Sequence, residues 1–471
     1  MINLAALQSQ LKTVGQSQVV RFLDQLNDAR RQKLSGQLAA LDLAIIAELA
    51  QTQVRQKSAI ALPADIQPVE AYPREPDASR RQLYADAERR GHELLRQGKV
   101  GAFLVAGGQG TRLGYDGPKG EYPVTPIKNK PLFQVFAEQL LAHGRDAGKP
   151  IAWYLMTSDI NDAPTRAFFA KHNYFGYDPA NIYFFQQGMM PAFSMNGDLL
   201  LAEKDSLALS PDGHGGSLRA LDKSGALADM HKRGIQHLSY FQVDNPLVHC
   251  IDPLFIGLHD LTGSEMSSKT IPKASALEKV GNFVVGDGVV QVIEYSDLPE
   301  ALALQTSADG TLRFNAGSIA IHALRISFIE RLNAGGKLQL PWHRAEKKVP
   351  YIDDAGSVVK PEKPNAVKLE QFVFDAIPLA KNAIVYTTDR GEEFSPVKNA
   401  EGVDSPATSR RDQIRRAAGW LRLAGLETPI KNGEPDALLE ISPHFATSAA
   451  QVARRNLNRS TVRSGESICF E

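Results

Sequence analysis

Apolar and polar residues follow two different patterns along this chain: helical spacing before about residue 99, and short apolar runs alternating with helices after it. In the first, the segments Leu4–Val14, Val19–Gln37 and Leu38–Gln51 carry apolar residues at the spacing of one helix face. A group of prolines between residues 63 and 76 predicts an extended connection, after which Ser79–Gly98 is helical again and rich in charge. We therefore expect residues 1–98 to form a helical N-terminal lobe without chemistry of its own.

After residue 99, short apolar runs alternate with helices. This alternation is typical of α/β proteins, in which a doubly wound sheet carries its functional site at the C-terminal ends of the strands. The predicted strands are Ala102–Ala106, Ile151–Thr157, Ile182–Gln186 and His237–Val243, and the predicted helices are Leu132–Ala147, Ala163–His172 and Gly225–Arg233.

A hairpin-rich stretch follows, and it makes the predicted sheet a mixed one. Gly281–Val285 and Val289–Tyr295 flank Gly286-Asp-Gly288, which is a strong turn signal. We expect residues 99–403 to form one large domain. Residues 404–471 become helical and basic and are predicted to form a small C-terminal region. The further predicted strands are Phe314–Ile321, Val349–Ile352 and Ala383–Tyr386, the last strand of the large domain.

The amino-acid composition argues against nucleic-acid and membrane partners. The 471 residues are 43% hydrophobic and 23% charged, as in an ordinary soluble globular protein. Lys+Arg and Asp+Glu both number 53, so there is no broad basic surface for nucleic acid. The two cysteines, Cys250 and Cys469, form neither a disulfide framework nor a zinc motif, which favours a cytoplasmic setting. No secretory signal and no membrane-length apolar run appear, so no membrane partner is expected.

The most informative stretch follows the first predicted strand of the large domain. The apolar run Ala102–Ala106 opens into a loop that contains Gly107, Gly108, Gly110 and Gly114. Arg112 lies inside this loop and Lys119 follows seven residues later. A buried strand that opens into glycines brings backbone N–H groups close to an anion, and the two cations add charge. We interpret the stretch as a loop that binds a nucleoside triphosphate.

Two familiar nucleotide-binding patterns do not fit this loop. A P-loop requires Ser or Thr after its lysine, whereas Gly120 follows Lys119. A dinucleotide-binding fingerprint requires a third glycine where this chain has Leu113, and Gly114 falls one residue late. An NAD-dependent dehydrogenase is therefore disfavoured. The pattern that remains is GxGTRLGxxxPKG, over residues 108–120.

With this loop and the motifs after it, the chain resembles the UDP-sugar pyrophosphorylases, and most closely the eukaryotic-type UDP-N-acetylglucosamine pyrophosphorylases. The resemblance extends from about residue 99 to about residue 445. It implies a Rossmann-like, GT-A-like nucleotidyltransferase domain over residues 99–403. The motifs that carry it are Leu104–Gly120, Tyr174-Phe-Gly176, Phe184–Pro191, Pro211-Asp-Gly-His-Gly-Gly216, Val243-Asp-Asn245, Val292–Ser296, Phe314-Asn-Ala-Gly317, Lys347–Tyr351, Lys363-Pro-Asn365, Glu370–Asp375 and Glu393–Asn399.

The resemblance implies which residues contact the nucleotide. It implies that Gln187, whose amide offers a donor and an acceptor, reads the uracil, and that Gly213 belongs to the loop that closes on it. It implies that Asp244, at a strand end, contacts the nucleotide and holds Mg²⁺. The implied nucleotide contacts at the glycine loop are Val105, Ala106, Gly107 and Gly108, and the implied catalytic, phosphate-binding cations are Arg112, Lys119, Lys368 and Lys398.

The sugar side departs from the pattern of the family. The implied sugar-binding residues are His214, Glu294, Tyr295, Asn315 and Ser318. Near relatives carry Asn where this chain has His214 and Ser318. A histidine ring has a different reach from Asn and can carry charge. The identity of the sugar therefore stays open at this stage.

The implied reaction joins UTP to a sugar 1-phosphate, with release of pyrophosphate. N-acetylglucosamine 1-phosphate is the expected sugar substrate and Mg²⁺ the expected cofactor. The alternatives are a UTP–glucose-1-phosphate uridylyltransferase, a broad UDP-sugar pyrophosphorylase, and a nucleotide-sugar-binding protein that has lost catalysis. Intact Arg112, Lys119, Asp244 and Lys398 argue against the last of these. A monomer or weak oligomer is expected.

Overall fold

The computed structural model describes residues 4–57, 61–336 and 338–471. They form two compact units. The first unit combines Met1–Leu62, Gln187–Ser217 and Gln339–Asp375, and the second combines Pro63–Gln186, Leu218–Leu338 and Ala376–Glu471. The predicted boundaries after residues 98 and 403 fall inside the second unit. Residues 1–3 and 58–60 of the predicted N-terminal lobe, and residue 337, lie outside the described residues.

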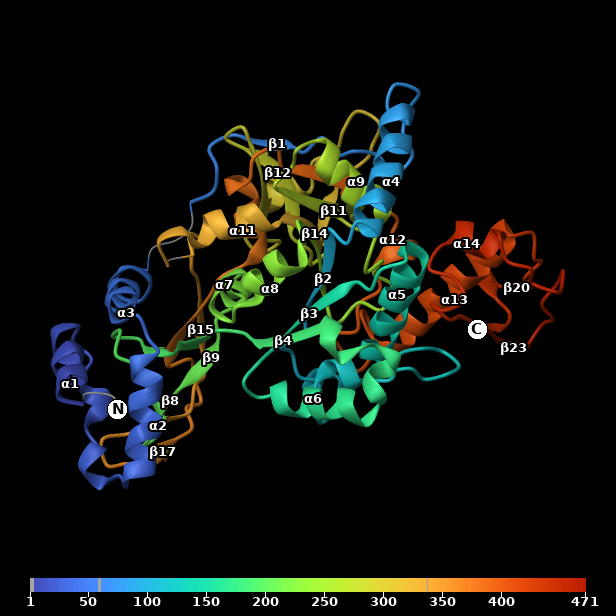
Figure 1. The fold of residues 1–471 in the computed structure, drawn as a ribbon. Coiled ribbons are helices and arrows are strands. Elements are labelled where there is room, and N and C mark those ends of the chain that lie inside the picture. Colours follow the sequence, from blue (N-terminus) through green and yellow to red (C-terminus); the bar gives the residue numbers. More distant parts are fainter. Residues whose placement is uncertain (1–3, 58–60, 337) are drawn as a thin grey trace. The chain divides into compact units, whose positions relative to one another are not determined.

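Within the described residues, the second unit is built on one ten-stranded mixed sheet (Figure 1). Its parallel half runs in the order β10, β2, β3, β4, with Phe103 beside Tyr240 on one side and Tyr154 on the other. This order confirms the predicted α/β fold. The bounds of these strands are β2 (Val100–Val105), β3 (Ala152–Thr157), β4 (Ile182–Gln186) and β10 (His237–Gln242).

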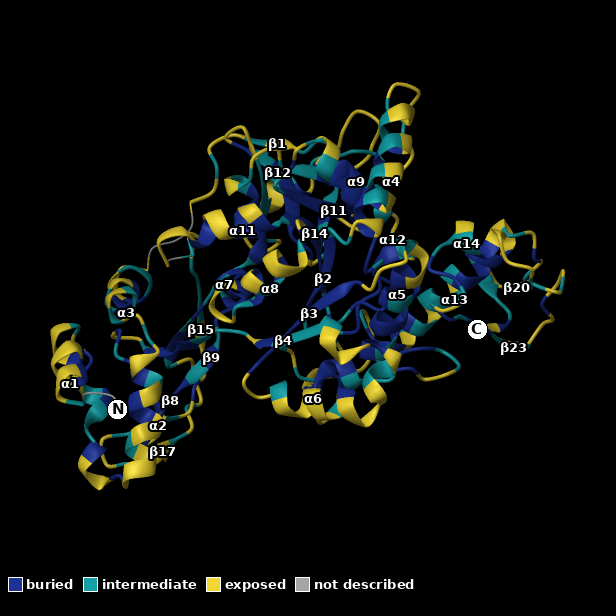
Figure 2. Ribbon diagram, in the orientation of Figure 1, coloured by how far each residue is buried: buried dark blue, intermediate teal, exposed yellow. Residues whose placement is uncertain are grey.

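Both faces of β10, β2 and β3 are buried, as Figure 2 shows in dark blue, and this explains why the sequences of β2 and β3 are almost continuously apolar, whereas β4 is largely half-buried. Successive side chains of a strand point to opposite faces. Leu104 packs in one core cluster with Phe136 of α5 (Leu132–Ala147). On the other face, the hydroxyl of Tyr154 donates to Asp229 of α8 (Ala226–Arg233) at 2.8 Å. Helices therefore cover both faces, as a doubly wound sheet requires.

The other half of the sheet is mainly antiparallel and includes the predicted hairpin. Strands β12 (Asn282–Gly286) and β13 (Val289–Ile293) are joined by Asp287 and Gly288, both at positive φ. Strand β1 (Ile66–Pro68), which lies in the predicted proline-rich connection, pairs with β12. The remaining strands of this half are β11 (Met266–Pro272), β14 (Ala316–Arg325) and β19 (Ile384–Thr387).

The C-terminal part of the second unit only partly follows the prediction. Its first helix, α13 (Pro406–Leu423), is present, but beyond residue 423 the expectation of a mainly helical region is wrong. The chain there forms β22 (Leu438–Ile441) and β23 (Ser467–Phe470), which pair in parallel around a small core of their own. The shorter elements are β20 (Ile430–Lys431), β21 (Glu434–Pro435) and α14 (Ala449–Ala453).

Further helices complete the second unit. The backbones of α4 and α9 touch, because a Cβ on Gly91 would meet the carbonyl oxygen of Pro253 at 1.8 Å. Only glycine permits this approach. The helices are α4 (Arg81–Arg96), α6 (Asp162–Lys171), α7 (Gly216–Lys223, which begins in the first unit), α9 (Pro253–Leu261), α10 (Glu300–Ala303), α11 (Ile326–Asn333) and α12 (Arg390–Glu393).

The first unit joins N-terminal helices to short strands from two later segments. Leu11, Leu34, Phe193 and Val367 share its hydrophobic core. One predicted helix is shorter here, because Asn27 accepts the amide of Arg30 and starts the helix at residue 28. The elements are α1 (Leu4–Thr13), α2 (Asp28–Ala39), α3 (Leu43–Leu49), β5 (Met189–Pro191), β6 (Phe193–Ser194), β7 (Leu201–Glu203), β8 (Ser206–Leu207), β9 (Leu209–Pro211), β15 (His343–Lys347), β16 (Tyr351–Ile352), β17 (Val358–Val359) and β18 (Ala366–Glu370).

In the part of the chain that the structure describes, no single helix is long and apolar enough to cross a membrane. The segments Asp28–Ala39 and Leu43–Arg55 meet the criteria of length and composition only as a pair, bent by 68°.

Candidate functional site

The glycine loop leaves the C-terminal end of β2 and folds back on itself. The amide of Ala106 still pairs with the carbonyl of Met156 at 2.8 Å. The carbonyl of Gly108 then accepts the amide of Lys119 at 3.1 Å, and the amide of Gly110 donates to the carbonyl of Gly117 at 2.9 Å. These two bonds close the loop at its base. They bring the backbone of Lys119, which follows the loop in sequence, next to Gly108 at its start.

Two glycines of this stretch have opposite surroundings. A Cβ on Gly120 would lie 2.1 Å from the ring of Phe133, in the middle of the core. A Cβ on Gly108 would have no atom of the protein within 4 Å. Packing therefore explains Gly120. It does not explain Gly108, at which a bound group has room to approach the backbone.

Lys119 shares its surroundings with the other charged residues of this unit that were predicted to bind phosphate or Mg²⁺. It is 7% exposed, although lysine is rarely buried without a partner. Burial lowers the pKa of its ammonium, the carboxylate of Asp244 opposes this, and the positive charges of Arg112 and Lys398 add to it. Three cations and one carboxylate, from three distant parts of the chain, thus share one electrostatic neighbourhood.

Backbone contacts fix the segments that carry Asp244 and Lys398. The carbonyl of Asp244, which follows the end of β10, accepts the amide of Val397 at 2.7 Å. The ammonium of Lys398 lies 3.7 Å from the carboxylate of Asp404 and 5.6 Å from the ring centre of Phe394. Because a main-chain bond joins the two segments, the separation of the two functional side chains depends little on flexible side-chain contacts.

Asn245 adds a side-chain bridge between the same two segments. Its Nδ2 donates to the carbonyl of Glu393 at 2.6 Å, and its Oδ1 accepts the amide of Ser395 at 3.1 Å. Glu393 in turn holds the fully buried ammonium of Lys269, at 2.7 Å from each carboxylate oxygen. Asp252 binds the other side of that ammonium at 2.5 Å.

Sequence reasoning missed several supporting residues. Asn161 is buried, and its Nδ2 donates to the carbonyl of Ala106 at 2.9 Å, which holds the entry of the glycine loop. The local signal for it was an Asn two residues before the predicted helix Ala163–His172. Asn245 and Glu393 lie inside motifs of the resemblance, but their roles depend on contacts that no local pattern displays. Lys269 lies in β11 with no sequence signal.

Two of the four predicted sugar residues of this unit lie near Gly281. A Cβ on Gly281 would lie 3.5 Å from a carboxylate oxygen of Glu294 and 3.6 Å from the Cβ of Ser318. Tyr295 is 47% exposed. Asn315 accepts the amide of Lys273 at 2.9 Å and lines a cavity of about 250 Å³. Glu294 and Ser318 thus lie on either side of Gly281.

The first unit holds the other four predicted residues. Gln187 donates from its Nε2 to the carbonyl of Gly213 at 2.8 Å, so the amide and the loop predicted to contact uracil lie together. Gly213 has φ +87°, and a Cβ there would lie 2.3 Å from the carbonyl of Gln371, which only glycine tolerates. Lys368 lies in β18 opposite Ala345.

His214 has a defined tautomer. Its Nδ1 accepts the amide of Val373 at 3.1 Å, so the proton of the neutral ring lies on Nε2. The ring stacks on Phe372, with 5.1 Å between ring centres. Burial, followed by the charge of His343, lowers the pKa of His214 to about 4. Near neutral pH the ring is therefore an uncharged donor.

The donor set near Asp244 limits the kind of metal site. Among the described residues, no group of three or more His, Cys, Asp or Glu side chains is placed to hold a metal ion. This excludes a metal cage made only of such side chains in the described part of the chain. It is compatible with Mg²⁺, which proteins commonly bind through one or two carboxylates plus the phosphates of a substrate.

The mixed sheet, with a cation-bearing glycine loop at its strand ends, defines a nucleotidyltransferase-type α/β protein. A family model described as UTP–glucose-1-phosphate uridylyltransferase matches residues 47–405. The chain belongs to that family.

Individual relatives agree with this assignment. A UDP-N-acetylhexosamine pyrophosphorylase-like protein 1 of Xenopus tropicalis is 39% identical over 461 residues, which cover 91% of this chain and 89% of that protein. The UDP-N-acetylglucosamine pyrophosphorylase of Saccharomyces cerevisiae is 38% identical over 376 residues, or 78% of each chain.

A solved structure extends the likeness to the fold. The uridine diphosphate N-acetylglucosamine pyrophosphorylase of Trypanosoma brucei superposes with a TM-score of 0.79 at 26% identity, over 96% of this chain and 94% of that one. The predicted resemblance to UDP-sugar pyrophosphorylases, the fold class and the nucleotidyltransferase class are confirmed.

Proposed function

We propose that this chain transfers the uridylyl group of UTP to N-acetylglucosamine 1-phosphate and so forms UDP-N-acetylglucosamine and pyrophosphate. The observation that carries the proposal is the cluster around Lys119. Its ammonium shares one neighbourhood with Arg112, Asp244 and Lys398, at the C-terminal ends of β2 and β10. This is the edge of an α/β sheet at which ligands bind.

The reaction fits a site made of cations rather than of a nucleophile and a base. A phosphate oxygen of the sugar 1-phosphate attacks the α-phosphorus of UTP. The bond from that phosphorus to the oxygen bridging to the β-phosphate breaks, and pyrophosphate leaves with the electron pair. The attacking oxygen is already anionic near neutral pH, so no general base is needed. The protein must instead bring two polyanions together and balance the charge that develops.

Each cation is assigned to particular phosphate groups of the substrates. Arg112, whose planar fork suits two phosphate oxygens, binds the triphosphate and the leaving pyrophosphate together with Lys119. Lys398 and Lys368 bind the phosphates around the reacting phosphorus. Burial of Lys119 strengthens its interaction with phosphate, because the effective dielectric constant there is lower than in water.

Asp244 is the residue that would hold Mg²⁺ together with phosphate oxygens. Mg²⁺, when bound, would neutralise part of the phosphate charge. The single carboxylate among three cations fits an ion that arrives with the nucleotide. Removal of divalent ions by a chelator should abolish turnover, and Asp244→Asn should raise the Mg²⁺ concentration needed for half-maximal activity.

The choice of N-acetylglucosamine 1-phosphate is supported by the names of the relatives with 35–39% identity. Glucose 1-phosphate is the second candidate, because His214 and Ser318 stand where near relatives carry Asn. His214 would act as a neutral donor, since its Nδ1 is occupied by the amide of Val373.

One assay tests the proposal and separates the candidates. The purified protein is mixed with UTP, Mg²⁺ and one of several sugar 1-phosphates, and release of pyrophosphate is followed. The highest kcat/KM is expected with N-acetylglucosamine 1-phosphate. A highest kcat/KM with glucose 1-phosphate would favour the second candidate. If none of the sugar 1-phosphates gives release of pyrophosphate, the transferase function is overturned.

We also propose that the enzyme works in the cytoplasm, as a monomer or weak oligomer, with no nucleic-acid or membrane partner. The formal net charge of zero and the use of two unpaired cysteines support this setting. Sedimentation velocity at micromolar concentration tests the assembly state, and a stable higher oligomer would contradict it.

A further inference from the structure

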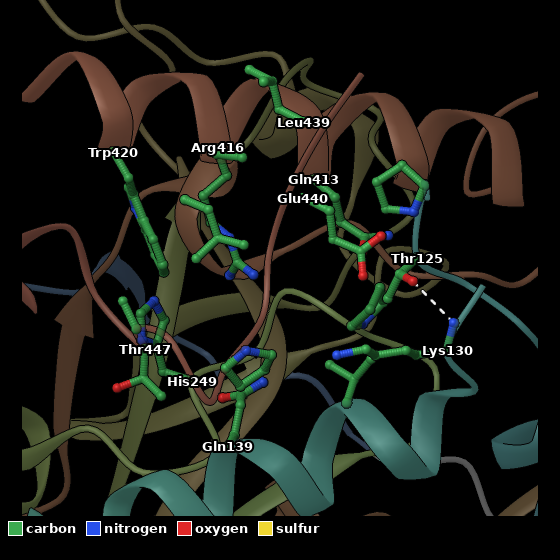
Figure 3. Close-up of a pocket in the computed structure, with 17 residues that line it drawn as sticks. Thr125, Lys130, Gln139, His249, Gln413, Arg416, Trp420, Leu439, Glu440 and Thr447 are labelled. Carbon is green, nitrogen blue, oxygen red and sulfur yellow. Dashed lines mark hydrogen bonds between the residues drawn. The ribbon is translucent and has the colours of Figure 1, made fainter. Parts of the chain in front are cut away.

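One arginine of the C-terminal region reaches the segments that carry the phosphate-binding residues. Arg416 projects from α13, and Figure 3 shows it beside Trp420 of the same helix and facing His249. Its Nη1 donates to the carbonyl of Leu247 at 2.8 Å and to the carbonyl of Glu392 at 3.0 Å. A single guanidinium nitrogen therefore bridges two distant stretches of main chain.

The two carbonyls lie close to the proposed catalytic centre along the chain. Leu247 comes three residues after Asp244, and Glu392 comes six residues before Lys398. The same two stretches are joined nearer the site by the main-chain bond from Val397 to Asp244. Arg416 thus joins the two segments at Leu247 and Glu392, and the main-chain bond joins them again beside Asp244 and Lys398.

Neighbouring contacts keep Arg416 in place. The guanidinium lies 5.0 Å from the ring centre of Trp420, whose Nε1 donates to the carboxylate of Glu392 at 2.8 Å. Burial lowers the pKa of Arg416 to about 10, so it remains protonated at neutral pH. The cavity beside these residues is about 50 Å³, which suits one or two water molecules but not a ligand.

Other residues of α13 contact the same parts of the chain. The hydroxyl of Ser409 donates to the carbonyl of Ser395 at 3.0 Å. Gln413 donates to the carbonyl of Val124 at 3.1 Å, and Arg410 to the carbonyl of Pro123, also at 3.1 Å. Pro123 and Val124 follow Lys119 closely. One face of α13 therefore meets the segments that carry Lys119, Asp244 and Lys398.

We propose that Arg416 is a positioning residue for the uridylyl transfer. Through it, the C-terminal region helps to hold Asp244 and Lys398 in place. The inference rests on the proposed function. Lysine at this position keeps the positive charge but lacks the planar guanidinium whose Nη1 donates to both carbonyls. Glutamine keeps one donor group without the charge.

The experiment compares Arg416→Lys and Arg416→Gln with the control Arg422→Gln. Arg422 lies on the same helix but donates to the carbonyl of Ala418 within that helix. We expect Arg416→Gln to lower kcat at least about tenfold, since small displacements of reacting groups carry large rate costs. We expect KM for the sugar 1-phosphate to change less than about threefold, because ground-state contacts remain. Arg416→Lys should be intermediate, and Arg422→Gln near wild type.

A second readout does not depend on turnover. Hydrogen exchange should become faster in peptides over residues 244–250 and 392–399 of the Arg416 variants, and should be unchanged in Arg422→Gln. Unchanged exchange in both peptides overturns the inference, as does a fall in thermal stability without a fall in kcat. If Arg416→Gln does not fold, Arg416→Lys carries both measurements. An inactive wild-type protein would overturn the proposed function, whereas an active wild type with unaffected variants would overturn only this inference.

Discussion

The amide of Val397 donates a hydrogen bond to the carbonyl of Asp244 at 2.7 Å. The two residues are more than 150 positions apart in the chain; Asp244 is the proposed Mg²⁺ residue, and Val397 directly precedes the proposed phosphate-binding residue Lys398. A main-chain bond joins two segments through fewer rotatable bonds than a contact between long side chains. The carboxylate of Asp244 and the ammonium of Lys398 are therefore held on one rigid support, as transfer between two phosphates requires.

Lys119→Met should lower activity and leave the fold intact. The ammonium is buried near Arg112 and Lys398, and its pKa is already lowered, so loss of its charge removes unfavourable burial and repulsion. We expect kcat to fall at least about tenfold, because a group that balances phosphate charge is lost. The thermal midpoint should stay the same or rise. Lys128→Met is the control, since Lys128 is 43% exposed and pairs with Glu471. Wild-type activity in Lys119→Met would contradict the assignment.

Two alanine substitutions in the glycine loop should have opposite signatures. Gly120→Ala forces a Cβ to 2.1 Å from the ring of Phe133, so we expect a loss of stability of about 1–3 kcal/mol in urea unfolding. Gly108→Ala meets no protein atom and should leave stability nearly unchanged. Its methyl group should instead obstruct the triphosphate and raise KM for UTP several-fold. An unchanged KM for UTP in Gly108→Ala would show that the nucleotide does not approach this backbone.

His214 should make the protein less stable in mild acid. Its folded-state pKa is lowered to about 4, whereas an unfolded histidine titrates near 6.5. Between these values only the unfolded state takes up the proton, so stability present above about pH 6.5 is lost as the pH falls towards 4. We expect the drop in unfolding free energy between about pH 7.5 and pH 5 to be smaller in His214→Asn than in wild type. Equal drops would contradict the prediction.

The buried ion group around Lys269 should show strong coupling. Glu393→Gln leaves the buried ammonium of Lys269 with Asp252 as its remaining carboxylate, and Lys269→Met leaves both carboxylates without their cation; breaking a buried pair in this way typically costs about 3–5 kcal/mol. The double variant should be more stable than the sum of the two losses predicts, in a double-mutant cycle measured by urea unfolding. Asp86→Asn is the control, because its pair with Arg89 is solvent-exposed and should contribute less than about 1 kcal/mol. Additive losses for Lys269 and Glu393 would refute the coupling.

Local patterns predicted much of the second unit. The helix over 132–147 has the predicted bounds, because apolar residues recur at helical spacing and Gly148 ends it at φ 69°. The turn at Asp287 and Gly288 was also evident from its residues. The strands β22 and β23 were not predicted, because they are short and pair across more than 25 residues, so neither has a repeat long enough to recognise.

The sequence by itself determined the glycine loop, the order of strands and helices that leads into it, and the motifs that place the chain in its family. These features depend on neighbouring residues, whose backbone preferences are expressed locally. Only the tertiary structure decided which of the predicted cations share a site. It brought Lys119 within electrostatic reach of Asp244 and Lys398, tied the segments of Asp244 and Lys398 together through Asn245 and Arg416, and combined three separate stretches into the first unit. Such contacts arise from packing and strand register between distant residues, which no local pattern contains.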